Sequence, residues 1–338
     1  MLSAARKLLS NIKPNITKLF ANNDPEPKAC VDVKIKVPWG NVCGKWWGPQ
    51  DRRPILVIHA IKENCGSFDR LIPMLSNKIG FLTIDLPGHG KSSHLPSGML
   101  YTDQMMLLTI HLIKNFFEWD RVSLMGHSSG AAIVFIYAVI CPRNCDMAIF
   151  LDALYPPFPP KHNKMDTIYK DMERALVIQR DLVKGPPTTT LGTLERTMYV
   201  QSGKSIDLQN VCYLLDQGVV PSKHDPGTYH FSRDTRCNLF SFRLVDREDC
   251  LFACRHVGFP ILITKTDDSP YFENEEEFTK FYKVLLYASR NCEVHDILGS
   301  HHVHLNEPEK IAKVVNKFLD KFDVNTKLSA KIDVKSKL

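Results

Sequence analysis

The sequence lacks the long hydrophobic run that a membrane helix requires. A span needs about 18 uninterrupted apolar residues, and the longest candidate, 131–140, is far shorter. Cys-x-x-Cys pairs and the Cys/His spacings of zinc sites are also missing, although the chain has 10 cysteines. We therefore expect no membrane span, no resident metal or organic cofactor, and reduced thiols that serve mostly as small core residues.

The sequence also lacks a concentrated basic motif. Lys and Arg number 43 against 37 Asp and Glu, a net charge of +6, and part of this excess lies at the two ends of the 338-residue chain. A nucleic-acid surface would instead cluster its basic residues with interleaved aromatics. The apolar share of 44% and the charged share of 24% are those of ordinary globular domains. These values exclude nucleic acid as the expected partner and exclude bulk disorder.

Apolar runs alternate with stretches of helical periodicity. The first run alternates apolar and polar residues, as a half-buried strand does, and the next looks like its hairpin partner. Most of the later runs are short, β-branched and continuous, which is typical of strands covered on both faces. Such alternation predicts an α/β fold, a mostly parallel sheet flanked by helices. The expected strands are 31–38, 40–47, 55–58, 81–86, 122–125, 147–151, 261–264 and 293–298, and the expected helices include 68–78, 101–117, 131–140 and 308–322.

The alternation stops after Leu154 at a proline-rich stretch, 155–160, which cannot continue a helix or a central strand. It resumes near residue 259, so a mainly helical cap inserted into one core is expected. The predicted organisation is a basic amphipathic segment (1–30), the first part of the core (31–154), the cap (155–258), the second part of the core (259–322) and a polar tail (323–338).

Both ends carry possible targeting signals. The chain terminates in Ser336, Lys337 and Leu338, a tripeptide that the peroxisomal import receptor reads as an address. The first 20 residues are basic and amphipathic, which is typical of a mitochondrial presequence. We predict a peroxisomal location with that receptor as partner, and mitochondrion or cytoplasm as the alternatives.

The pentapeptide Gly126-His127-Ser128-Ser129-Gly130 follows an expected strand and precedes an expected helix. This is the context of a nucleophile elbow, in which a sharp turn presents the central serine at the sheet edge. Glycines two residues before and two after remove Cβ clashes in so tight a turn. Ser128 is therefore the predicted nucleophile.

At this point the chain resembles the α/β-hydrolase superfamily and, within it, the serine hydrolase-like (kraken) family. The resemblance runs from about residue 31 to 322 and implies an α/β-hydrolase fold with a helical cap. Its motifs are His59-Ala60-Ile61, 66–73, 85–92 (Asp-Leu-Pro-Gly-His-Gly-Lys-Ser), 126–130, 231–234 in the cap, and 300–308.

A serine hydroxyl needs a base within hydrogen-bond reach and a third group that orients the base. In this fold the chain order is Ser, acid, His. The resemblance implies that the base is His301, with His302 and His304 as neighbours. For the acid we predict Asp268, after the strand 261–264, and keep Asp267 and Asp152 as alternatives; the simplest role of Asp152 is to cap the loop into the insertion.

The oxyanion of acyl transfer needs two preorganised donors. The expected donors are the backbone amides of Ser129, after the nucleophile, and of Ile61. Relatives usually carry glycine where this sequence has Ala60. Because alanine tolerates positive φ poorly, a loop that required such geometry there would misplace the Ile61 amide.

These residues predict a cofactor-independent serine hydrolase that cleaves small apolar carboxylic esters or thioesters through an acyl-enzyme. Two other functions remain open. Ala60 favours a catalytically weak or silent scaffold that binds an apolar ligand or a partner. The C-terminal tripeptide suggests a peroxisomal acyl-CoA thioesterase.

Overall fold

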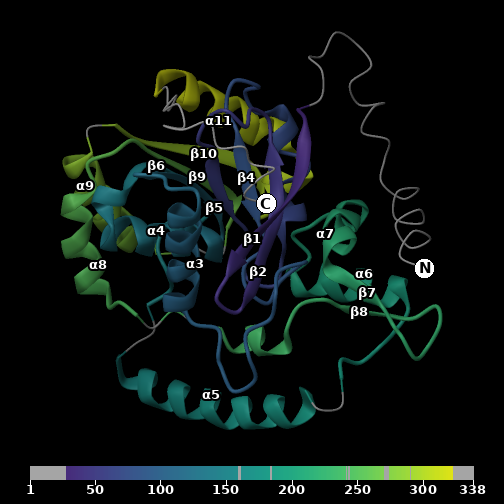
Figure 1. Ribbon diagram of the computed structural model, residues 1–338. Helices are drawn as coiled ribbons and strands as arrows, with labels where there is room; N and C mark the ends of the chain where they lie inside the picture. Colours follow the sequence, from purple (N-terminus) through teal and green to yellow (C-terminus); the bar gives the residue numbers. More distant parts are fainter. Residues whose placement is uncertain are drawn as a thin grey trace.

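A computed structural model describes residues 28–158, 161–182, 185–240, 242, 244–269, 274–289 and 291–322. Its centre is an eight-stranded sheet in the order β1-β2-β4-β3-β5-β6-β9-β10 (Figure 1). Strand β2 is antiparallel to both neighbours, and all other pairings among these strands are parallel. The predicted α/β class is confirmed. The strands are β1 (Cys30–Val37), β2 (Gly40–Trp47), β3 (Ile55–Ile58), β4 (Phe81–Ile84), β5 (Val122–His127), β6 (Cys145–Leu151), β9 (Ile261–Asp268) and β10 (Cys292–Ser300).

Helices cover both faces of the sheet. Alternate residues of β3 belong to two different apolar clusters, because successive side chains of a strand point to opposite faces. One cluster joins the sheet to α3 (Asp103–Phe116), α4 (Ser129–Ile140) and α9 (Glu275–Ala288), and the other joins it to α11 (Pro308–Lys321). Because every residue of β3 and β4 is buried, their sequences show continuous apolar character.

The expected helix 68–78 is wrong. The chain there forms two short 3₁₀ turns, Cys65–Phe68 and Ile72–Met74. Pro73 lies within the second turn and cannot donate the backbone hydrogen bond that a continuing helix needs. Leu75 is then extended, with φ −85° and ψ 160°, which ends the turn.

The segment between β6 and β9 contributes to two different parts of the molecule. Helices α6 and α7 share their own apolar cluster with Leu305 of α10 (Val303–Asn306). Helix α8 lies instead in the core layer, where it packs against α4 and α9 (Figure 1). The elements of the segment are α5 (Lys161–Leu182), α6 (Leu191–Gln201), α7 (Val211–Gly218), β7 (Val219–Pro221), β8 (Tyr229–Phe231) and α8 (Arg247–Ala253).

The two targeting signals lie outside the described residues, so their predictions stay predictions. Within the described part of the chain, none of the helices combines the length and the apolar character that crossing a bilayer demands.

Candidate active site

Ser128 stands between the end of β5 and the start of α4, as predicted. Its backbone has φ 55° and ψ −127°, a conformation that an L-residue rarely adopts and that costs about 1–3 kcal/mol at functional sites. A Cβ on Gly126 would lie 2.6 Å from the Gly130 carbonyl, and one on Gly130 would lie 2.4 Å from the Ile58 carbonyl oxygen. Both glycines are therefore required for the close approach of β3, β5 and α4 at this turn.

His301 follows β10 and is buried beside the elbow. Its Nδ1 lies 2.6 Å from Oδ2 of Asp152. A carboxylate only accepts, so Nδ1 carries the proton and Nε2 is the unprotonated, basic nitrogen of the ring. Burial lowers the pKa of the His301 imidazole below its ordinary value of 6.5, against the opposing hydrogen bond to Asp152. The ring is thus held as a neutral base at neutral pH.

The structure corrects the prediction for the acid, because the carboxylate on His301 is that of Asp152 and not that of Asp268. Asp152 comes directly after β6, is 1% exposed and has a φ of 51°. Its second oxygen, Oδ1, accepts a 2.6 Å hydrogen bond from the Thr266 amide. Asp268, at the end of β9, is exposed. Asp267 is exposed too, and its Oδ1 accepts from the Gly299 amide at 2.6 Å.

Ser128 and His301 border one cavity of about 630 Å³. The side of the cavity formed by the segment between β6 and β9 carries Gln201 and Ser202 but is otherwise apolar, which suits the hydrocarbon part of an acyl group. Its large apolar side chains are five. Sequence reasoning assigned none of these apolar residues to the site, since aromatic and Met side chains are core residues more often than ligand contacts. They are Phe158, Met198, Ile206, Phe240 and Phe242.

The loop after β3 has unstrained geometry at the residue that raised concern. The positive φ of this loop falls at Lys62, at 80°, and not at Ala60. The Lys62 amide donates to Nε2 of His89 at 3.2 Å, while Nδ1 of His89 lies 3.0 Å from the Pro87 carbonyl oxygen. His89 therefore links the loop after β3 to the turn that follows β4.

The residues that carry the two expected oxyanion amides, Ile61 and Ser129, are in direct contact. The Ile61 amide donates to Oγ of Ser129 at 2.8 Å. This contact places the loop after β3 directly against the start of α4. The Ser129 hydroxyl thus occupies one of the two backbone amides that were expected to bind an oxyanion.

The other two histidines of the 300–308 motif face away from Asp152. Nε2 of His302 lies 2.9 Å from Oε1 of Glu63, and Nε2 of His304 lies 2.9 Å from Oγ of Ser67. Of these three histidines, only His301 is hydrogen-bonded to Asp152. Glu63 was not singled out in the sequence, because it lies in a loop and no spacing connects it to residues 302 and 304.

Known proteins resemble this chain in sequence and in fold. Residues 53–277 match the model of the alpha/beta hydrolase fold family. The chain is 30% identical to a probable serine hydrolase of Drosophila melanogaster over 85% of this chain and 87% of that protein. Among solved structures, a hypothetical protein from Pseudomonas aeruginosa has a TM-score of 0.74 at 22% identity, over 86% of this chain and 98% of its own. The thioesterase domain of the curacin biosynthetic pathway has a TM-score of 0.68 at 18% identity, over 85% and 99%.

Proposed function

Because the chain belongs to the serine hydrolase-like family of α/β-hydrolases, we propose that it hydrolyses carboxylic esters or thioesters with Ser128 as nucleophile, His301 as base and Asp152 as the acid. The observation that carries this proposal is the buried Nδ1–Oδ2 pair of His301 and Asp152, 2.6 Å apart, with His301 on the same cavity as the strained serine. A base oriented by a carboxylate beside a serine is the arrangement that activates a hydroxyl.

The reaction then proceeds in two acyl transfers. Oγ of Ser128 forms a bond to the acyl carbon while Nε2 of His301 takes the hydroxyl proton. The amides of Ile61 and Ser129 receive the oxyanion, after which the carbon–oxygen or carbon–sulfur bond breaks and His301 returns the proton to the leaving group. Water, deprotonated by His301, then attacks the acyl carbon of the acyl-enzyme. The bond between that carbon and Oγ of Ser128 breaks, His301 returns the proton to Oγ, and the carboxylic acid is released. The carboxylate of Asp152 orients the His301 ring and stabilises the imidazolium.

The test is covalent labelling with a fluorophosphonate probe, followed by mass spectrometry of the labelled peptide. We expect one adduct, located on Ser128, together with turnover of short p-nitrophenyl esters. A folded protein that binds an apolar fatty acid but neither reacts with the probe nor turns over esters would establish the silent scaffold instead. The relaxed geometry at Ala60 favours the enzyme, whereas the engaged Ile61 amide is what a scaffold would also show.

The preferred leaving group distinguishes an esterase from an acyl-CoA thioesterase. The cavity lining suits an apolar acyl chain and does not by itself separate an oxygen ester from a thioester. Paired assays with p-nitrophenyl butyrate and butyryl-CoA compare the two directly. A preference for the acyl-CoA would support the thioesterase, and with it the proposal of a peroxisomal location that rests on Ser336 to Leu338.

The pH dependence follows from the direction of the His301 shift. A protonated His301 cannot accept the Ser128 proton, so kcat/KM should fall as the pH drops through the pKa of His301. Since burial lowers that pKa below 6.5, we expect a plateau at neutral pH and a loss that begins only in the acidic range. A pH profile of kcat/KM, taken where the melting temperature is constant, measures this. An apparent pKa above 6.5 would contradict it.

A further inference from the structure

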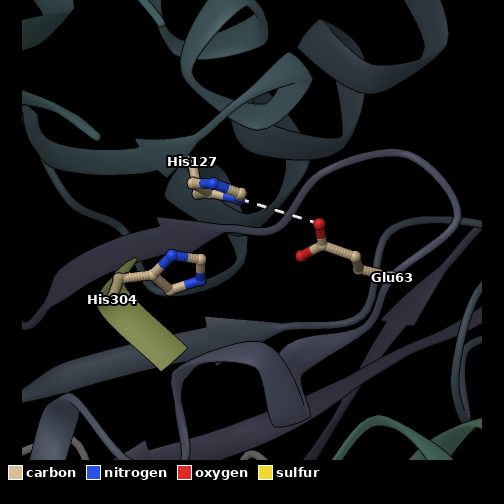
Figure 2. Close-up of side chains that lie close together, drawn as sticks. All are labelled: Glu63, His127 and His304. Carbon is tan, nitrogen blue, oxygen red and sulfur yellow. Dashed lines mark ion pairs between the residues drawn. The ribbon is translucent and has the colours of Figure 1, made fainter. Parts of the chain in front are cut away.

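Behind the elbow lies a buried cluster of three potential metal ligands (Figure 2). Glu63 comes from the loop after β3, His127 from the last position of β5 and His304 from α10. One ligand atom from each residue lies within 4.8 Å of the others, and all three side chains are buried. The residues are 64 and 177 positions apart in the chain, so no motif could have shown them. We call them the Glu63 cluster.

The Nδ1 atom of His127 faces the carboxylate of Glu63. Its Nε2 lies 2.9 Å from the His301 carbonyl oxygen, which can only accept, so Nε2 carries a proton. Nδ1 is buried and has no hydrogen-bond partner. It lies 3.7 Å from Oε1 of Glu63, too far for a hydrogen bond. Nδ1 of His127 and Oε1 of Glu63 thus face each other across 3.7 Å, a spacing at which a cation could contact both atoms.

Glu63 and His304 are joined through a serine. Oγ of Ser67 donates to Oε2 of Glu63 at 2.7 Å and so accepts from Nε2 of His304 at 2.9 Å. This leaves Nδ1 of His304 buried without a partner. The cluster thus offers one carboxylate and two buried ring nitrogens that have no hydrogen-bond partner.

We propose that Glu63, His127 and His304 bind one divalent first-row transition-metal ion. Imidazole nitrogen and carboxylate oxygen are ligands that Zn²⁺ takes at about 2.0–2.2 Å, so neighbouring ligand atoms stand about 3.4 Å apart in a tetrahedral site. The observed 3.7 Å between His127 Nδ1 and Glu63 Oε1 needs little contraction. A histidine ligand whose other ring nitrogen donates to a backbone carbonyl is the usual second-shell support of such sites.

The ion has a route into the cluster from the cavity. Glu63 and His302 both line the cavity that holds Ser128, and Oε1 of Glu63 is the oxygen nearest to His127. Three protein ligands leave a fourth position for water, which can enter from the same side. The bound ion would then lie between Nδ1 of His127 and Glu63, on the side of the His127 ring away from the His301 carbonyl, next to the catalytic residues but not among them.

The test measures binding directly, with ZnCl₂ as the probe and the full chain stripped of metal. Equilibrium dialysis with elemental analysis should give one tightly held Zn²⁺ per chain. His304→Gln and Glu63→Gln should each weaken binding by about tenfold or more. His224→Gln and Cys30→Ser, which alter an exposed imidazole and an exposed thiol, are the matched controls and should bind as the unaltered chain does.

If the variants of the Glu63 cluster fail to fold, a measurement on the unaltered chain still tests the proposal. The X-ray absorption fine structure of the zinc complex should show two imidazoles and no sulfur. The proposal would be overturned by a sulfur shell at about 2.3 Å or by loss of binding in a control variant. It would also be overturned if the chain held no stoichiometric zinc, which would mean that a proton on His127 balances Glu63. Fluorophosphonate labelling of Ser128 requires no metal, so the two proposals can fail independently.

Discussion

Asp152→Asn is expected to lower kcat for ester hydrolysis by about 10⁴-fold, and the hydrogen bonds around the residue explain why. The Thr266 amide can only donate, and Oδ1 of residue 152 accepts from it. An asparagine must keep its oxygen there, which turns its NH₂ group toward Nδ1 of His301. That nitrogen then becomes an acceptor, and the ring proton moves to Nε2. Nε2 can no longer take the proton of Ser128.

Asp268→Asn is the matched control, and we expect it to keep activity close to that of the unaltered chain because Asp268 is exposed at the end of β9. Steady-state kinetics on a p-nitrophenyl ester, with melting temperatures for both variants, make the comparison. Because asparagine has nearly the same shape as aspartate, we expect both variants to keep the fold. An unchanged melting temperature would show that the inactivity of Asp152→Asn does not come from unfolding. Full activity of Asp152→Asn with an inactive Asp268→Asn would restore the original prediction for the acid.

The position of Ser128 at the turn between β5 and α4 could be predicted because its signal is local. Gly126 and Gly130 flank Ser128 within five residues, and the steric reason for both glycines, the approach of Gly130 to the Ile58 carbonyl, is a property of the turn itself. The buried strand before it and the apolar helix after it are also continuous in the sequence. Nothing about distant contacts had to be known to place Ser128 at the sheet edge.

The carboxylate that contacts His301 could not be chosen in the same way, because each of two neighbouring strands is followed by, or ends in, an aspartate. β6 and β9 are parallel and paired, with Leu151 opposite Thr264, so carboxylates that follow either strand reach the same edge. The apolar pattern ends at Thr264 and suggests that the strand ends there. The strand in fact continues to Asp268, with Asp267 and Asp268 exposed. Only this register, set by pairing with β10, leaves Asp152 as the partner of His301.

The Glu63 cluster and the cavity lining were beyond sequence reasoning for a related reason. Their members come from segments that meet only in three dimensions, and each residue alone has an ordinary structural role. Phe240 and Phe242, for example, are partly buried against the main apolar cluster and also line the cavity. A pattern along the chain reports which face of an element is apolar, but not which other element faces it.

Ser128→Ala should have the largest effect of all, a loss of roughly 10⁵- to 10⁶-fold in kcat together with complete loss of fluorophosphonate labelling. Without Oγ no acyl-enzyme can form, and the remaining oxyanion donors and binding contacts supply only the residual rate. The fold should be unaffected. Alanine keeps the Cβ that makes φ 55° costly, and the Ser128 amide still donates to the Leu151 carbonyl oxygen.

Ser129→Ala is the adjacent control. It removes a hydroxyl one position along but keeps both the Ser128 nucleophile and the backbone amide of residue 129, so we expect it to remain labelled. Labelling, kinetics and melting curves of the two variants, measured side by side, separate the loss of a nucleophile from disturbance of the turn. If Ser128→Ala were labelled like the unaltered chain, the nucleophile would lie elsewhere, and the strained backbone at residue 128 would have no catalytic purpose.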